Sequence, residues 1–171
     1  MATQTSSLIG ANLGGIGDST ALFALGTVAF GSQGSEWEYV YVTSTHVTGK
    51  IVVINQNGTG KVALPAMLTA YGTQAQFGFV QNAVNQGEYT WVAKRGRGLY
   101  VLCSATFTSA PDSAMGFALS ANSGRLIGRA AGADGTTMFG VFCLSGPATS
   151  NVTEGVVGLF SLLWPRAATN G

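Results

Sequence analysis

The chain has few charged side chains. Aspartate, glutamate, lysine and arginine together make up 9% of its 171 residues, against roughly 25% in an ordinary soluble domain. Hydrophobic residues account for 46%, a normal share, so the exterior must consist mainly of small and uncharged polar residues. Such a surface has weak electrostatic protection against association. We therefore expect much of it to be covered by further copies of the chain or by a larger assembly; a secreted β-protein with an uncharged surface is the alternative.

Other absences limit the partners and the location. A net charge of +1 provides no long-range field toward nucleic acid or an anionic membrane, so neither is expected as a partner. No basic segment followed by an apolar stretch begins the chain, so no signal peptide is predicted. The longest apolar run, residues 156–164, is too short to span a bilayer. Cys103 and Cys143 lie inside apolar runs, which favours buried thiols in a reducing cytoplasm over a disulfide between adjacent strands.

The residue sets that catalysis requires are also missing. The one histidine, His46, has no second histidine, cysteine or carboxylate pair near it in sequence, so we expect a turn or surface position and no zinc site. No G-x-S-x-G nucleophile elbow occurs. Glu36 and Glu38 are expected to be solvent-facing charges rather than a glycosidase pair or calcium ligands. We predict no catalytic residue, metal ligand or cofactor, and therefore no enzyme; a small hydrolase is the least favoured alternative.

Glycine, in contrast, is abundant at 25 residues, which indicates many tight turns between short strands. Residues 36–42 alternate, with three aromatic side chains on one face and the two glutamates on the other. Turn signals follow at Asn57-Gly58, at residues 85–87, and at Gly96 and Gly98. The pattern predicts an all-β core over residues 25–165, an antiparallel barrel or sandwich of short strands. At most one short helix is expected, at residues 65–71.

Three segments lie outside this pattern. Residues 1–24 contain one charge, Asp18, and no apolar period, so we predict an extended N-terminal arm, with terminal disorder as the alternative. Residues 166–171 are predicted to form a flexible C-terminal tail. The basic cluster at residues 94–97 is interpreted as a charged hairpin tip or a contact to an acidic partner. It lacks the wide basic face of a nucleic-acid site.

Five segments carry a resemblance to a known family. Residues 25–28 (LGTV), followed by residues 34–42 (GSEWEYVYV), resemble the opening of the head decoration, or cement, proteins of tailed bacteriophages. The similarity continues in residues 77–83 (FGFVQNA), 87–92 (GEYTWV) and 98–101 (GLYV), and it covers about residues 25–145. The basic cluster and the glycine-rich arm are not part of the family pattern, so the resemblance does not indicate how the chain docks.

The resemblance implies a structural virion protein, made in the host cytoplasm, that binds the capsid exterior. Its partners would be the major capsid protein and further copies of itself, usually in a trimer, and the family implies no catalytic residues or cofactors. The arm could add a strand to a sheet edge of a partner. The candidate capsid or subunit contacts are Leu8, Ile9, Leu13, Ile16, Lys94, Arg95 and Arg97.

A different class of protein is the alternative reading. The chain would then be a receptor- or glycan-binding module of a phage fibre or spike, in which aromatic side chains stack on sugar rings. The candidates for stacking are Trp37, Tyr39, Tyr41 and Trp91, and packing in a core explains them equally well.

Overall fold

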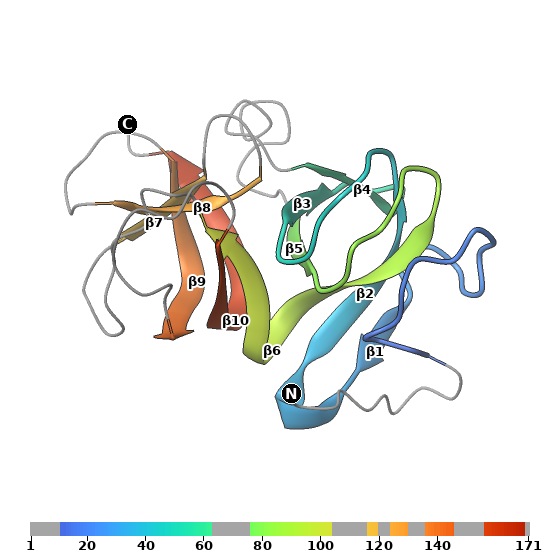
Figure 1. Ribbon diagram of the computed structural model, residues 1–171, viewed down its shortest axis with the longest axis horizontal. Helices are drawn as coiled ribbons and strands as arrows, with labels where there is room; N and C mark the ends of the chain where they lie inside the picture. The colour runs from blue at the N-terminus through green and yellow to red at the C-terminus, as the bar shows by residue number, and fades with distance from the viewer. Residues whose placement is uncertain are drawn as a thin grey trace.

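The computed structural model describes residues 11–62, 76–103, 116–119, 124–129, 136–145 and 156–169. They form strands, one 3-10 turn (η1) and irregular segments, which confirms the all-β prediction (Figure 1). The short helix predicted at residues 65–71 lies outside the described residues. The elements are β1 (Val28–Phe30), η1 (Ser32–Gly34), β2 (Glu36–Val42), β3 (Ile51–Ile54), β4 (Thr59–Val62), β5 (Gln76–Val80), β6 (Tyr89–Cys103), β7 (Gly116–Leu119), β8 (Leu126–Arg129), β9 (Thr136–Ser145) and β10 (Val156–Thr169).

Five strands close into a barrel. Their order is β2–β4–β3–β5–β6, and β6 pairs again with β2. The β2–β4 contact is parallel and the other four are antiparallel. The β3–β4 turn falls at the predicted Asn57-Gly58. There the Asn55 side chain accepts hydrogen bonds from the backbone N–H groups of Asn57 (3.0 Å) and Thr59 (2.9 Å).

The interior of this barrel is filled by β-branched aliphatic side chains. Such side chains are stiff and pack well on a pleated surface. Gly78 faces the same space, because a Cβ there would lie 2.6 Å from Cγ2 of Val92. The interior is therefore too narrow for a larger residue at that point. The side chains that fill it are Val40, Val42, Val52, Ile54, Val80, Val84 and Val92.

The 15-residue strand β6 belongs to two rings of strands. Its first half pairs with β2 and β5, and its second half pairs with β10. The order β6–β10–β9–β7–β8 returns to β6 through the pair Cys103–Leu126. The molecule therefore has two lobes that share β6, as Figure 1 shows. We call the β2–β6 barrel the first lobe and the β6–β10 ring the second lobe.

The corner predicted at Gly96 and Gly98 is a bend within one strand and not a turn between two strands. The strand runs through both glycines, which have positive φ values of 141° and 71° and bend β6 where it passes between the lobes. A Cβ at Gly96 would lie 2.8 Å from Cβ of Ser35. The basic cluster at residues 94–97 is consequently part of a continuous strand and not a hairpin tip. The expectation of short strands fails likewise for β6 and for the 14-residue β10.

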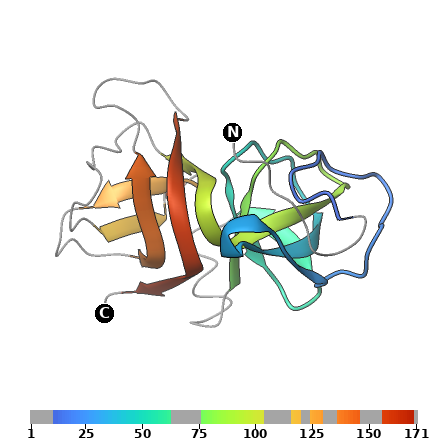
Figure 2. The same ribbon diagram turned by 90° about the horizontal axis from the view of Figure 1, so that it is seen from below.

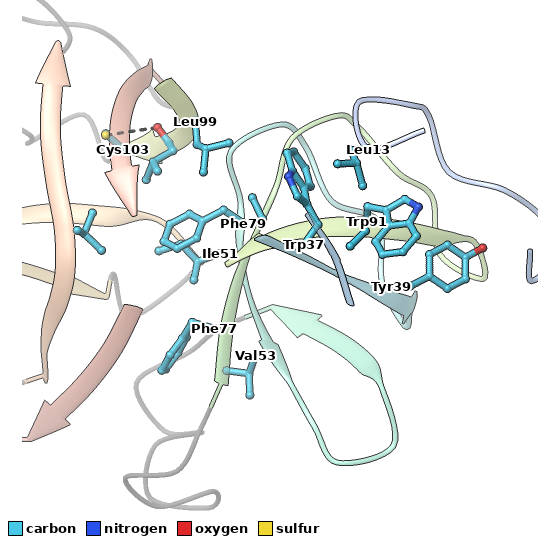
Figure 3. Close-up of a cluster of buried hydrophobic side chains, with 14 residues drawn as sticks. Leu13, Trp37, Tyr39, Ile51, Val53, Phe77, Phe79, Trp91, Leu99 and Cys103 are labelled. Carbon is cyan, nitrogen blue, oxygen red and sulfur yellow. Dashed lines mark hydrogen bonds between the residues drawn. The ribbon is translucent and has the colours of Figure 1, made fainter. Parts of the chain in front are cut away.

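A second cluster of buried side chains lies on the outer face of the first barrel (Figure 3). Alternation along the strands points these residues away from the barrel interior. The largest are Trp37, Tyr39, Phe77, Phe79 and Trp91. Val141 from the second lobe and Leu13 from the N-terminal segment belong to the same cluster. The aromatic face of the barrel is thus covered from two sides.

The N-terminal segment lies on the first lobe of its own chain. Residues 11–24 run along its outer side, in blue in Figure 2, without regular strand structure. Asp18 and Tyr89 exchange two backbone hydrogen bonds of 2.8 Å, and Leu13 is buried. Residues 1–10, with Leu8 and Ile9, lie outside the described residues. At the other end, β10 pairs with β9 as far as Thr169, so the predicted tail from residue 166 is mostly strand.

Candidate interaction surface

Lys94, a predicted contact residue, is engaged within the chain. Its Nζ lies 2.8 Å from Oε2 of Glu38 and 3.0 Å from Oε1 of Gln76. The Lys94 and Glu38 side chains are only 15% and 11% exposed. Glu38 is two residues from Val40 and Lys94 is two residues from Val92, so both side chains point to the same side of the sheet as the interior valines. The pair therefore closes one end of the first barrel. The expectation that Glu38 faces solvent is wrong, because its charge is held by a cation from a neighbouring strand.

The remaining basic residues of the cluster do not form one surface. Arg95 is half-buried, and its backbone is paired with Glu36 of β2 and Leu163 of β10. Arg97 is exposed. Alternation along β6 and the bend at Gly96 send neighbouring side chains in different directions. Of the cluster, Arg97 is therefore the residue that remains available to a partner.

The N-terminal segment and β1 expose a row of apolar side chains. Leu13 is 2% exposed and belongs to the core, so it is removed from the candidate contacts, whereas Ile16 is 82% exposed. Isolated exposed apolar residues are common, but several large ones within one short segment favour an interaction surface. We call the five exposed apolar side chains of residues 16–30 the N-terminal apolar strip; they are Ile16, Leu22, Leu25, Val28 and Phe30.

A hollow of about 130 Å³ opens beside this strip. The Trp91 ring packs edge-on against Phe23, with ring centroids 5.2 Å apart. Asp18 supplies the acidic group of the hollow. Burial raises the pKa of the Tyr39 hydroxyl, and the Asp18 charge raises it further. That hydroxyl accepts a hydrogen bond from the backbone N–H of Leu22 at 3.1 Å. The lining residues are Asn12, Ile16, Asp18, Leu22, Phe23, Thr90 and Trp91.

The second lobe carries another exposed apolar group. Leu159 of β10 is paired with Tyr100 of β6, and Val157 lies two residues away on the same face. All three side chains are more than a third exposed. We call Tyr100, Val157 and Leu159 the second-lobe apolar face.

His46 occupies a loop as predicted, but it is not at the surface. It is fully buried and forms an isolated bridge with Val84. Neither ring nitrogen makes a hydrogen bond of regular geometry with the described residues. Burial, with a smaller contribution from the Lys50 charge, lowers the pKa of His46 to about 4, and the nearby Gly60 backbone raises the pKa of the ring only slightly. The imidazole is consequently neutral at physiological pH, and its burial is one feature that local sequence did not indicate.

The aromatic residues proposed for sugar stacking are mostly in the core. Trp37 and Tyr39 are fully buried and Trp91 is nearly so, while Tyr41 is half-buried. Cys103 is buried as predicted; the Cys143 side chain lies outside the described part. The described residues contain no group of three or more potential metal ligands among His, Cys, Asp and Glu. They also contain no helix with the length and apolarity needed to cross a membrane.

Comparisons of the chain with family models, with curated proteins and with solved structures found no match.

Proposed function

We propose that the chain is a structural virion protein that binds the outside of an assembled bacteriophage capsid as a homo-oligomer and stabilises contacts between capsid proteins. The observation that carries this proposal is a pair of separate apolar surfaces, the N-terminal apolar strip and the second-lobe apolar face. They occur in a chain with only 9% charged residues. A subunit that must contact both its own copies and a shell needs two interfaces, and each lobe offers one.

Capsid binding of this kind would stabilise the shell by mass action. A ligand that binds only the intact shell adds about 2.7 kcal/mol per site when its free concentration is 100 times the dissociation constant. An oligomer with one shell-binding surface per copy gains further, because the second and later contacts form at high effective concentration. No catalytic step enters this function, and no metal or cofactor is required for it.

The alternative function, a receptor- or glycan-binding module, has less support. Core packing accounts for Trp37 and Tyr39, whose rings are fully buried. Trp91 lines the hollow but is itself only 5% exposed, so little of its ring face is offered for stacking. Binding on a glycan array, with no binding to capsids, would favour this alternative.

The decisive test is co-sedimentation of the purified protein with capsids assembled from the major capsid protein of the same phage. We expect saturable binding and a higher rupture temperature of the occupied shells. Leu22→Asp places a charge in the N-terminal apolar strip, and Val157→Asp places one in the second-lobe apolar face. We expect one variant to reduce capsid binding and the other to reduce the fraction of oligomer. Gln56→Asp, on an exposed turn of the first lobe, is the matched control. Absence of co-sedimentation at saturating protein would overturn the proposal.

A further inference from the structure

The charge pairing of the described residues leaves Asp18 without a side-chain partner. Glu38 is paired with Lys94. The Glu88 carboxylate accepts hydrogen bonds from the backbone N–H (2.8 Å) and side-chain amide (3.2 Å) of Asn85, which lower its pKa. Asp18 is held by its backbone to Tyr89, and its carboxylate forms no hydrogen bond or ion pair with the described residues. Since Asp18 lines the hollow, a cation from outside the subunit that enters the hollow could pair with its carboxylate.

The hollow suits a guanidinium group. Its lining combines the half-buried Phe23 ring, the small exposed part of Trp91, the apolar rim of Ile16 and Leu22, and the Asp18 carboxylate, with no basic residue among them. Arginine stacks on aromatic rings, pairs with carboxylates and is more weakly hydrated than lysine. A cavity near 150 Å³ holds a benzene molecule, so about 130 Å³ accommodates one side-chain end.

The chain itself offers a matching cation. Arg97 is exposed and makes no hydrogen bond or ion pair with the described residues. Among the basic side chains that the structure describes, it alone is in the exposed class. Arg97 cannot reach Asp18 of its own subunit, because Asp18 pairs with Tyr89 and Arg97 is eight positions further along β6. At ~3.3 Å per residue the path along the strand is ~26 Å, and the bend at Gly96 shortens only its last step.

We propose that the hollow beside Asp18 receives Arg97 of the partner subunit. The inference rests on the proposed homo-oligomer and deepens it by assigning the contact between copies. Asp18 lies on the first lobe and Arg97 lies where β6 passes between the lobes, so the contact joins two unlike patches and closes into a ring if the rotation permits. The same contact covers Ile16 and Leu22 at the rim. An arginine anchored in an apolar hollow is typical of residues that dominate interface energies.

A double-mutant cycle in the full chain tests the contact. The variants are Asp18→Asn, Arg97→Gln and the double variant, and the native mass is followed by analytical ultracentrifugation over a dilution series. Each single change should raise the dissociation constant of the oligomer at least ~30-fold, as loss of one partner of a buried interfacial pair does. The double variant should be no weaker than either single variant, because the partners act as a unit.

Matched controls distinguish the loss of this contact from an effect of the changed net charge and from an effect on folding. Gln56→Lys and Gln56→Glu make the same charge changes on an exposed turn, and both should leave the mass unchanged. The thermal midpoint of monomeric Asp18→Asn should match that of the wild-type monomer, because the carboxylate has no described partner within its subunit.

Four results would overturn the inference. Single variants that keep the wild-type mass would exclude the contact, and additive losses would show that the two residues act separately. Loss of the oligomer in Asp18→Asn but not in Arg97→Gln would assign the hollow to another cation. A wild-type protein that is monomeric at every concentration would remove the homo-oligomer itself, while the capsid co-sedimentation assay tests the remainder of the proposed function independently.

Discussion

Replacing Lys94 by methionine would leave the Glu38 carboxylate without its cation at the end of the first barrel. The Lys94 Nζ atom is 2.8 Å from Oε2 of Glu38, and Glu38 as a whole is 8% exposed. Breaking a fully buried pair by removing one partner costs about 3–5 kcal/mol. The side chains of this pair keep 15% and 11% exposure, so water screens part of that cost. We expect Lys94→Met to lower the free energy of unfolding by about 2–3 kcal/mol.

The measurement is urea denaturation at pH 7, read from the midpoint at an unchanged slope. Glu38→Met combined with Lys94→Met removes both charges and should return the stability to within about 1 kcal/mol of the wild type, since apolar replacements of buried pairs are often neutral. A single-variant loss below about 0.5 kcal/mol would place this pair in the range of exposed surface pairs. That result would refute the view that the Glu38–Lys94 pair closes the barrel. A double variant as unstable as Lys94→Met alone would refute the same view.

Three further predictions test the remaining features. The folded-state pKa of His46, about 4, is below the unfolded value near 6.5, so the unfolded state binds the proton first. Stability should then fall by up to about 3 kcal/mol between pH 6.5 and 4, and His46→Leu should lack this slope in urea titrations at each pH. Gly96→Ala should lower the free energy of unfolding by about 2 kcal/mol, because the residue has a positive φ and its new Cβ would lie 2.8 Å from Cβ of Ser35. Gly98→Ala, with no neighbour within 4 Å, should lose only about 1 kcal/mol; equal thermal midpoints would contradict this. Leu13→Ala should cost about 2 kcal/mol and the 82% exposed Ile16→Ala almost nothing, and similar midpoints for the two would show that the N-terminal segment does not pack as described.

Features that depend on neighbouring residues could be predicted from the sequence. The alternation over residues 36–42 located β2 with its observed bounds, Glu36–Val42. Asn57-Gly58 located the β3–β4 turn, because an asparagine–glycine pair accepts the required backbone conformation. The all-β class followed from the same repeated signals. Burial of Cys103 followed from its apolar neighbours.

Features that depend on which strands meet could not be predicted in this way. Gly96 and Gly98 have the local signature of a turn, yet pairing with β2 and β10 on either side keeps β6 continuous. His46 is isolated in sequence, and only the bridge to Val84 brings it into the interior.

The candidate site shows the same division. Asp18 stood out in the sequence as the one charge of the N-terminal segment, but its position beside Trp91 required that segment to fold back onto β6. Glu38 and Lys94, 56 residues apart, meet only because the barrel closes. Local sequence thus determined the strands, their faces and their turns, since these depend on side chains a few residues apart. The tertiary structure decided which charges are paired, which glycines bend rather than end a strand, and which apolar side chains stay exposed, because each depends on contacts between distant segments.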